Sequence, residues 1–346
     1  MAKALRRAAA VMLAAAALLS LTGCGAPQRH SRSWYTWFDT VTTLAGYGSD
    51  RDFDAACALT EQTLDKYHRL CDIYHEYGGM NNVRTVNLSA GRAPVETAAE
   101  LRQVLSFGKE VHALTGGMCS IAMGAVLSQW HDCREAALNG GEARLPDETA
   151  LRTAAEHCAI DDLVIDDEAG TVYLADPRMS LDLGAVAKGY AAEQAARALE
   201  AAGYTGFALS VGGNVRTVGG KADGSAWVAG IQDPDADSDS AYVLRIALRD
   251  ASLVTSGSYQ RFYEVDGVRY HHIISPETLF PRNDFLSVSI LCADSGLADA
   301  LSTAVFNMDL ENGVNYVNQV EGVEACWILA DGEIRYSSGF EAYILP

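Results

Sequence analysis

Lys188 stands at the start of an alanine-rich segment, where a positive charge could meet a bound anion. The run from residue 180 to 203 reads SLDLGAVAKGYAAEQAARALEAAG, which predicts a strand, a turn at Gly184 and then a helix. The first turn of a helix leaves N–H groups unpaired and carries the positive end of the dipole, so Lys188 would strengthen an anion site. The alternative is a lysine that only reaches from the helix into solvent.

Asp299 and Thr303 lie four residues apart in SGLADALSTAVF, which is expected to be helical. Residues at this spacing share one helix face, so a carboxylate and a hydroxyl would project together. Hard oxygen ligands of this kind suit Mg²⁺, which takes few ligands from a protein and completes its shell with phosphate oxygens and water. The alternative is local, with Asp299 capping the helix and Thr303 bonding back to its own main chain.

Two adjacent histidines, His271 and His272, occur in YHHIISP within an expected strand. Successive strand residues point to opposite faces, so at most one of them can face a given site. Histidine is the side chain best able to carry a proton near neutral pH, although a lone histidine is more often structural. Strand spacing alone leaves open which of the two histidines faces the site.

Two glycine-containing stretches add weaker signals. In LSVGGNVRTVGG, Gly212 and Gly213 follow an apolar strand, where the missing side chains let the backbone approach a ligand or another strand. In LVTSGSYQRFY, a cluster of short donors ends a strand before Arg261. Either pattern is usually only a turn, so neither decides the function alone.

Together these stretches resemble the ApbE-like FAD:protein FMN transferases. The similarity runs from about residue 34 to the end and rests on motifs in the family's order and spacing: IYHEYGGMNNVRTVN, TGGMCSIAMGAVLSQWHD, LDLGAVAKGYA, SVGGNV, VTSGSYQRF, YHHIISPETLFP and ADALSTAVF. The resemblance implies a Mg²⁺-dependent enzyme that cleaves the pyrophosphate of FAD. It would attach FMN through a phosphoester to a threonine of a partner protein and release AMP.

The resemblance also implies roles for individual residues. It places the metal on the main-chain carbonyl of Ala185 and the side chains of Asp299 and Thr303, and it makes His272 the proton acceptor. If His272 has this role, replacement of His271 should leave activity nearly normal. Lys188 would lie beside the diphosphate. The residues implied to contact flavin are Tyr74, Met118, Cys119, Asp182, Lys188 and Ile273. A tyrosine such as Tyr74 could stack on the isoalloxazine ring or belong to the core.

The chain departs from the family pattern at three places, and each departure removes a carboxylate. The family often has GDY where this chain has Ser258, DP where it has Ser275, and an aromatic residue followed by Asp where it has Met118 and Cys119. Two other functions stay open: an FAD pyrophosphatase that uses water as acceptor, and a lipoprotein that binds FAD without chemistry. Retention of both His272 and the Asp299/Thr303 pair argues against the second, because binding alone needs no proton acceptor.

The elements that would position these residues are of mixed type. Helices are predicted over residues 52–70, 97–115, 147–157, 185–202 and 295–307. Strands are predicted over residues 41–47, 162–174, 206–211, 226–231, 242–248, 261–265, 268–274, 286–293 and 324–336, with a solvated loop at 232–240. Strands occur both in consecutive hairpins and beside helices, which predicts an α+β fold with mixed sheets and flanking helices.

The first residues read as an export signal. A basic start precedes an apolar run that is shorter than the ~20 residues needed to span a bilayer. The following LTGC resembles a bacterial lipobox, which implies that Cys24 is lipidated; an ordinary cleaved signal with a chance cysteine is the alternative. We therefore expect a signal at 1–23, a polar tether at 24–33 and an ApbE-like domain at 34–346, anchored at the extracytoplasmic face of the cell membrane.

Charge and cysteines limit the partners. Without the three basic residues of the leader, the chain has 23 basic and 45 acidic side chains, a formal charge of −22, which excludes nucleic acid as a partner. The acceptor implied by the resemblance is an exported flavoprotein or a membrane redox subunit. Seven scattered cysteines follow Cys24 without a CxxC pair, so neither a disulfide framework nor a zinc site is indicated, and most should be buried.

Overall fold

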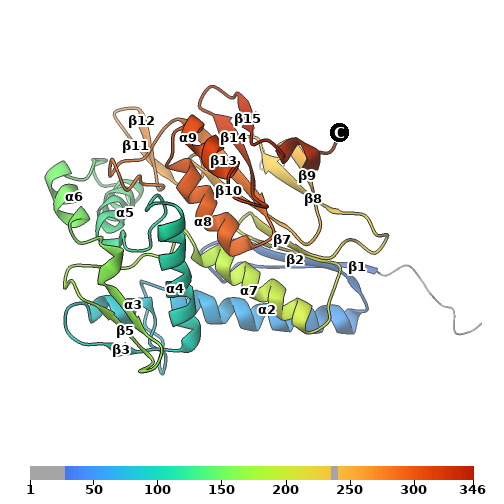
Figure 1. The fold of residues 1–346 in the computed structure, drawn as a ribbon, viewed down its shortest axis with the longest axis horizontal. Helices are drawn as coiled ribbons and strands as arrows, with labels where there is room; N and C mark the ends of the chain where they lie inside the picture. The colour runs from blue at the N-terminus through green and yellow to red at the C-terminus, as the bar shows by residue number, and fades with distance from the viewer. Residues whose placement is uncertain (1–27, 235–240) are drawn as a thin grey trace, which may run out of the picture.

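The computed structural model describes residues 28–234 and 241–346. Its centre is an eight-stranded antiparallel sheet. In their order across the sheet, the strands are β1 (Gln28–Trp34), β2 (Thr42–Gly48), β6 (Phe207–Val211), β7 (Asn214–Val218), β10 (Ser252–Gly257), β13 (Phe285–Cys292), β14 (Glu324–Leu329) and β15 (Ile334–Tyr336). With helices beside it, this sheet confirms the predicted α+β class (Figure 1).

Both faces of the sheet are covered. Helices α2 (Asp50–Cys71), α7 (Ala187–Ala201) and α8 (Ser295–Phe306) pack together on one face, as Figure 1 shows. A ribbon of β8 (Trp227–Gln232) and β9 (Tyr242–Leu248) shares a buried cluster with the opposite face. This two-sided burial follows from strand periodicity, because alternate residues of a strand point to opposite faces.

A second group of elements flanks the α7 and α8 side of the sheet. It contains a small sheet in the order β3-β5-β4 and a hairpin of β11 and β12. Its strands are β3 (Val95–Glu96), β4 (Leu163–Asp166), β5 (Thr171–Leu174), β11 (Phe262–Val265) and β12 (Val268–His271). Its helices are α3 (Val83–Leu88), α4 (Ala99–Leu114), α5 (Gly124–Leu138) and α6 (Glu148–Ala155), while α9 (Leu310–Val317) follows α8 and packs near β14. Two short 3₁₀ turns, Ile160–Asp162 and Phe340–Tyr343, complete the described elements.

All five predicted helices are present, with bounds that differ by a few residues. The predicted strands at 162–174 and 324–336 are instead two hairpins, β4–β5 and β14–β15, because each contains a turn. The strand predicted over 268–274 ends at His271. Residues 28–33, expected in the polar tether, instead form most of β1 and pair with β2.

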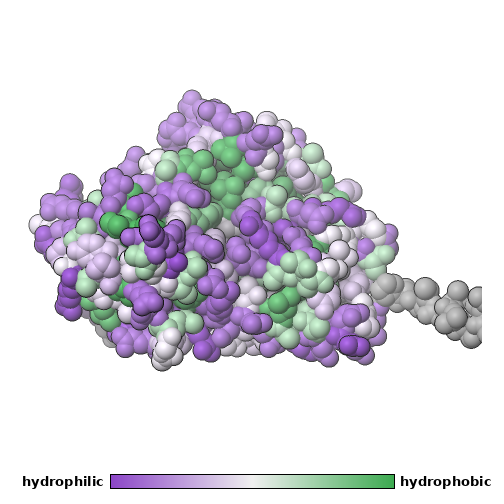
Figure 2. All heavy atoms as spheres, turned by 60° about the horizontal axis from the view of Figure 1, so that its bottom comes forward, coloured by the Kyte–Doolittle hydropathy of each residue, from purple (hydrophilic) through white to green (hydrophobic). Residues whose placement is uncertain are grey.

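Several predictions about the chain's ends and cysteines have different outcomes. The leader, Cys24 and part of the loop at 232–240 lie outside the described residues. The seven later cysteines are all free, and six of them are buried, as predicted. None of the helices in residues 28–234 and 241–346 is long and apolar enough to cross a membrane. The face in Figure 2 is mostly hydrophilic with separate apolar areas, as the chain's charge leads us to expect.

Candidate active site

Lys188 lies in the first turn of α7, just after a tight turn. The turn is held by Asp182, whose Oδ1 accepts a hydrogen bond from the main-chain N–H of Gly184 at 2.8 Å. The side chain of Lys188 is 26% exposed, and its Nζ lies 3.4 Å from the Gly184 carbonyl oxygen and 3.6 Å from Oδ1 of Asp299. The lysine therefore folds over the start of its own helix toward a carboxylate, and the alternative of a lysine that only reaches solvent is wrong.

Asp299 links α8 to the start of α7. Its carboxylate is buried, and Oδ2 accepts a hydrogen bond from the Gly189 N–H at 2.8 Å. A side chain at position 189 would not fit, because a Cβ there would lie 2.3 Å from both the Cβ of Asp299 and the carbonyl oxygen of Ser295. Asp294 caps α8 through the N–H of Leu297, so Asp299 does not serve as the helix cap. The Asp299 carboxylate, which has no capping role, is therefore available to bind a ligand.

The hydrogen bond from Gly189 to Asp299 also takes away the helical partner that the Ala185 carbonyl would otherwise have. In a regular helix the N–H of Gly189 would donate to the carbonyl four residues earlier, which is that of Ala185. Here this N–H donates to Asp299, and α7 begins only at Ala187. The Ala185 carbonyl, the Asp299 carboxylate and the Thr303 hydroxyl one turn further along α8 are all hard oxygen donors. We call Ala185, Lys188, Gly189, Asp299 and Thr303 the helix junction.

These donors fit magnesium better than a metal held by the protein alone. Within the described ranges, no group of three or more His, Cys, Asp or Glu side chains could hold a metal ion. A site with one carboxylate, one hydroxyl and one carbonyl suits a cation that keeps part of its shell for phosphate oxygens and water. The chemistry of the donor set is therefore consistent with the predicted Mg²⁺.

Met118 and Cys119 lie beside the helix junction. The N–H of Cys119 donates to the Thr115 hydroxyl at 3.2 Å, and the Asn307 amide at the end of α8 donates to the Met118 carbonyl at 3.2 Å. Burial raises the pKa of the Cys119 thiol to about 12, and the nearby Asp299 charge adds to the rise. The thiol therefore stays protonated and is a poor nucleophile.

The two histidines have sharply different surroundings. His271 is buried, packs edge-on against Phe306 and uses both ring nitrogens: Nε2 donates to the Arg282 carbonyl at 2.6 Å, and Nδ1 accepts from the Ile273 N–H at 3.2 Å. His272 follows the strand and is exposed, with its Nδ1 3.3 Å from the Arg261 carbonyl oxygen. If Nδ1 carries the proton and donates to that carbonyl, Nε2 of His272 is free to accept one.

The charges around His272 favour its neutral form. Desolvation lowers the pKa of the imidazole, and the positive charges of Arg261 and Lys188, with His271 nearby, lower it further. The His272 ring is exposed to solvent on one side, and the protein around its other sides desolvates it. Because the Lys188 charge contributes to the shift, His272 lies within electrostatic range of the helix junction.

Ile273, like Cys119, is a predicted flavin contact whose side chain is buried. Its side chain is buried in the cluster between α8 and the sheet, and its N–H is occupied by His271. Any ligand contact is therefore confined to a small exposed part of the residue. Ser258 and Ser275, which replace carboxylates of the family pattern, also have local roles: the Ser258 hydroxyl donates to the Leu286 carbonyl, and the buried Ser275 accepts from the Glu277 N–H.

Tyr74 lies in a second part of the site, within electrostatic range of Asp182. Tyr74 follows α2, is 52% exposed and is not a core residue; its ring centroid lies 5.5 Å from that of His131 on α5, at 35°. Desolvation raises the pKa of Tyr74, and the Asp182 charge adds to this rise. Desolvation also raises the pKa of Asp182, opposed by the Gly184 N–H and by His131. We call Tyr74, His131 and His272 the exposed group.

Sequence reasoning did not find His131, because it did not recognise α5. The helix has a usable signal, since its buried Val126, Trp130 and Cys133 are spaced by four and three residues. Trp130 also packs on both strands of the β11–β12 hairpin, through Tyr263 and Tyr270. The same helix therefore contacts Tyr74 and supports the hairpin that leads to His272.

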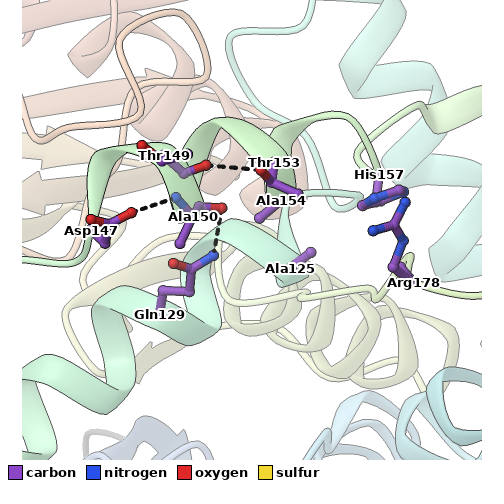
Figure 3. A pocket seen from close by; sticks show the side chains of 9 residues that line it. All are labelled: Ala125, Gln129, Asp147, Thr149, Ala150, Thr153, Ala154, His157 and Arg178. Atoms are coloured by element: carbon purple, nitrogen blue, oxygen red, sulfur yellow. Dashed lines mark hydrogen bonds between the residues drawn. The ribbon is translucent and has the colours of Figure 1, made fainter.

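Two hollows on the surface lie away from this site. One hollow of about 490 Å³ lies between α5 and α6, where Figure 3 shows the Gln129 side chain hydrogen-bonded to Ala150 of the facing helix. Another of about 360 Å³ lies between α4 and α7 and is lined by Phe107 and Tyr190. None of the predicted site residues lines either hollow. The site is recognised by its charges and hydrogen bonds rather than by cavity volume.

Comparison with known proteins identifies the family. The model of the ApbE family matches residues 38–327. An FAD:protein FMN transferase of Treponema pallidum is 36% identical over 270 residues, which cover 73% of this chain and 72% of that protein. Another FAD:protein FMN transferase, of Klebsiella pneumoniae, is 28% identical over 282 residues, which cover 81% of this chain and 85% of that protein.

Solved structures agree with this result. The crystal structure of the ApbE protein of Thermotoga maritima superposes with a TM-score of 0.80 at 26% identity, covering 92% of this chain and all of that one. The flavin transferase ApbE of Vibrio cholerae gives a TM-score of 0.76 at 23% identity over 92% and 99% of the two chains, which shows a shared fold. The predicted resemblance is confirmed, and the chain belongs to the ApbE family.

Proposed function

We propose that this protein transfers FMN from FAD to a threonine hydroxyl of an acceptor protein and releases AMP, with Mg²⁺ at the helix junction. Transfer of FMN from FAD to a protein is the activity for which its relatives are named, and 36% identity over most of the chain supports it here. The observation that carries the proposal is the placement of an exposed, neutral His272 near Lys188, which itself contacts Asp299.

The reaction balances with the groups that are present. The threonine oxygen bonds to the phosphorus that carries the flavin, the bond from that phosphorus to the bridging oxygen breaks, and AMP leaves with that oxygen. The hydroxyl proton goes to Nε2 of His272, which is free if Nδ1 donates to the Arg261 carbonyl. A pKa below the usual value keeps this ring unprotonated at neutral pH, as a general base requires.

Lys188 and the start of α7 would bind the diphosphate. A lysine charge beside the unpaired N–H groups of a helix start stabilises negative charge that builds up on phosphate oxygens. Bound Mg²⁺ would be held by Asp299, Thr303 and the Ala185 carbonyl and would neutralise part of the diphosphate charge. Tyr74 would lie against the isoalloxazine ring, with Asp182 nearby.

Location and acceptor rest on the sequence. The leader and the LTGC motif support lipidation at Cys24 and a position at the extracytoplasmic face of the cell membrane. An enzyme held there would reach exported flavoproteins and membrane redox subunits. Replacement of Cys24 by alanine should abolish lipid labelling and release the protein from the membrane fraction.

One observation favours a second activity at the same site. His272 is open to solvent, so a water molecule could take the place of the threonine hydroxyl and give FMN and AMP. This FAD pyrophosphatase reaction needs the same base and the same diphosphate contacts. The two activities differ only in which hydroxyl reaches the phosphorus.

A mass measurement separates the possibilities. The purified chain is incubated with FAD, Mg²⁺ and a threonine-bearing acceptor, and in parallel with the same acceptor carrying valine in place of that threonine. Transfer predicts that only the first acceptor gains the mass of FMN less one water, with AMP formed in equal amount. AMP with free FMN and an unmodified acceptor would identify a pyrophosphatase, and tight FAD binding without AMP would identify a storage protein.

A further inference from the structure

A single carboxylate organises the loop that carries Tyr74. Asp72 ends α2, and its side chain is only 5% exposed. Oδ1 accepts from the N–H groups of Tyr74 at 2.6 Å and His75 at 3.0 Å. Oδ2 accepts from the Tyr77 hydroxyl at 2.7 Å and lies 3.0 Å from Nδ1 of His75. Four contacts from three residues thus converge on one carboxylate.

Helix stability does not explain this acid. The C-terminal end of a helix carries the negative end of the dipole, where a carboxylate is unfavourable and a basic residue is favoured. Arg69 satisfies that preference in the last turn of α2, whereas Asp72 opposes it. Hydrogen bonds from Tyr77, Tyr74 and His75 outweigh burial and lower the pKa of Asp72, so the charged form is the one that the loop stabilises. The carboxylate therefore serves the loop after the helix.

The loop is fixed at its far end as well. The buried Asn82 donates from Nδ2 to the carbonyls of Arg69 at 3.1 Å and His75 at 2.8 Å. Tyr74 lies between Asp72 and Asn82 in the chain, and its half-exposed ring contacts the ring of His131. The orientation of the Tyr74 ring is therefore set mainly by the main chain that Asp72 holds, and less by burial of the ring itself.

We propose that Asp72 is a positioning residue that holds Tyr74 ready to lie against the flavin of FAD. The inference rests on the flavin contact of Tyr74 in the proposed function. An aromatic ring contributes to binding only when its plane meets the ligand in a suitable orientation. A ring that is already fixed avoids the ordering cost that a mobile loop would incur on binding.

The test measures FAD binding by titration calorimetry on the full chain with Asp72→Asn. The amide keeps the shape of the side chain but cannot accept all four contacts, so we expect FAD to bind roughly 5- to 20-fold more weakly. The rate of flavin transfer at saturating FAD should change less than about 3-fold, because the helix junction is untouched. Glu76→Gln is the matched control, since Glu76 is an exposed acid of the same loop and should leave FAD binding unchanged.

A double-mutant cycle shows whether Asp72 acts through Tyr74. In a Tyr74→Ala background, Asp72→Asn should weaken FAD binding by less than about 2-fold. Equal weakening in both backgrounds, or unchanged FAD affinity in the single variant, would overturn the inference. If Asp72→Asn does not fold, Tyr77→Phe removes one of the four contacts and should still weaken binding through Tyr74 alone. Wild-type protein that binds no FAD would instead refute the proposed function.

Discussion

The helix junction and the exposed group are built in opposite ways. In the junction, Asp299 is 4% exposed, and Gly189 packs so closely against it that no Cβ could be added. In the exposed group, Tyr74 is 52% exposed and His272 is also open to solvent. The junction is held by helix packing on both sides, whereas Tyr74 and His272 lie on connecting segments.

This difference matches what each part has to bind. The diphosphate is the same in every FAD molecule, and its charge is best stabilised by groups that do not move during the reaction. In the proposed reaction the acceptor protein would approach from solvent, so a base that meets its hydroxyl would have to remain reachable. Buried residues nevertheless hold the main chain beside the exposed ones. His271 accepts a hydrogen bond from the segment that carries His272, and Asp72 accepts one from the N–H of Tyr74. Rigid support for reachable groups is what precise positioning requires.

The largest effect should come from His272→Ala. Loss of the general base should slow transfer to the acceptor by roughly 10²–10⁴-fold. FAD binding and the thermal unfolding midpoint should change little, because His272 is exposed and makes one long side-chain contact. Rates are measured by acceptor mass under FAD saturation. Transfer at the wild-type rate would show that His272 is not the base.

His271 provides the contrast. Its replacement is expected to leave the chemistry nearly normal, but the structure adds a cost in stability, because the ring is buried and satisfies both the Ile273 N–H and the Arg282 carbonyl. His271→Ala should therefore lower the free energy of unfolding by about 2–4 kcal/mol, since it opens a cavity and leaves two buried groups unpaired. Urea unfolding followed by circular dichroism measures this. A stable variant with slow transfer would contradict the division of roles.

Gly189→Ala tests the packing of the junction. The added Cβ would meet α8 at 2.3 Å, so α7 and α8 must separate, at a cost of about 1–3 kcal/mol of unfolding free energy. The matched control is Gly78→Ala, because a Cβ at that loop position meets nothing within 4 Å. Denaturant midpoints of both variants decide the question. Equal stability would mean that the junction is looser than its contacts indicate.

Lys188→Met should affect ligand binding more than stability. The methionine keeps most of the stem but removes the charge beside the diphosphate, so FAD should bind about 10-fold more weakly. Asp299 keeps its hydrogen bond from Gly189, and the free energy of unfolding should fall by less than about 1 kcal/mol. Calorimetric titration with FAD and thermal unfolding measure the two effects. Intact FAD affinity with a large loss of stability would reverse this assignment.

The comparison also separates what the sequence could predict from what it could not. Helices α7 and α8 follow from their residue patterns, and the bounds of β9 agree with the predicted 242–248. In contrast, β1 reads QRHSRSW, with little apolar alternation, and its strand form depends on pairing with β2. Local patterns cannot reveal an edge strand that a neighbour specifies.

The site shows the same limit. Nothing in local spacing brings Lys188 to Asp299, which is more than a hundred residues away, and only the family resemblance placed them together. His131 was missed with its helix, and Asp72 was missed because an acid after a helix looks like an ordinary surface residue. Their importance depends on hydrogen bonds and ring contacts that only the folded chain makes.

The most gradual expected effect is a loss of stability in mild acid, and it follows from the buried support of the exposed group. Burial lowers the pKa of His271 below its ordinary 6.5, so the folded protein resists protonation of this ring. The unfolded chain takes up a proton at about pH 6.5, and below that pH it binds more protons than the folded state. The free energy of unfolding should therefore be level above pH 6.5 and fall with acidification.

His271 contributes at most about 1.4 kcal/mol per pH unit to the slope of unfolding free energy against pH. His272 and His112 contribute with the same sign, because their pKa values are also lowered. Urea titrations between pH 5 and pH 8 measure the slope. His271→Gln lowers stability at every pH, but it should also flatten the acid limb, because the group whose proton is excluded is gone. If the variant keeps the wild-type slope, the buried ring is not what makes the site sensitive to acid.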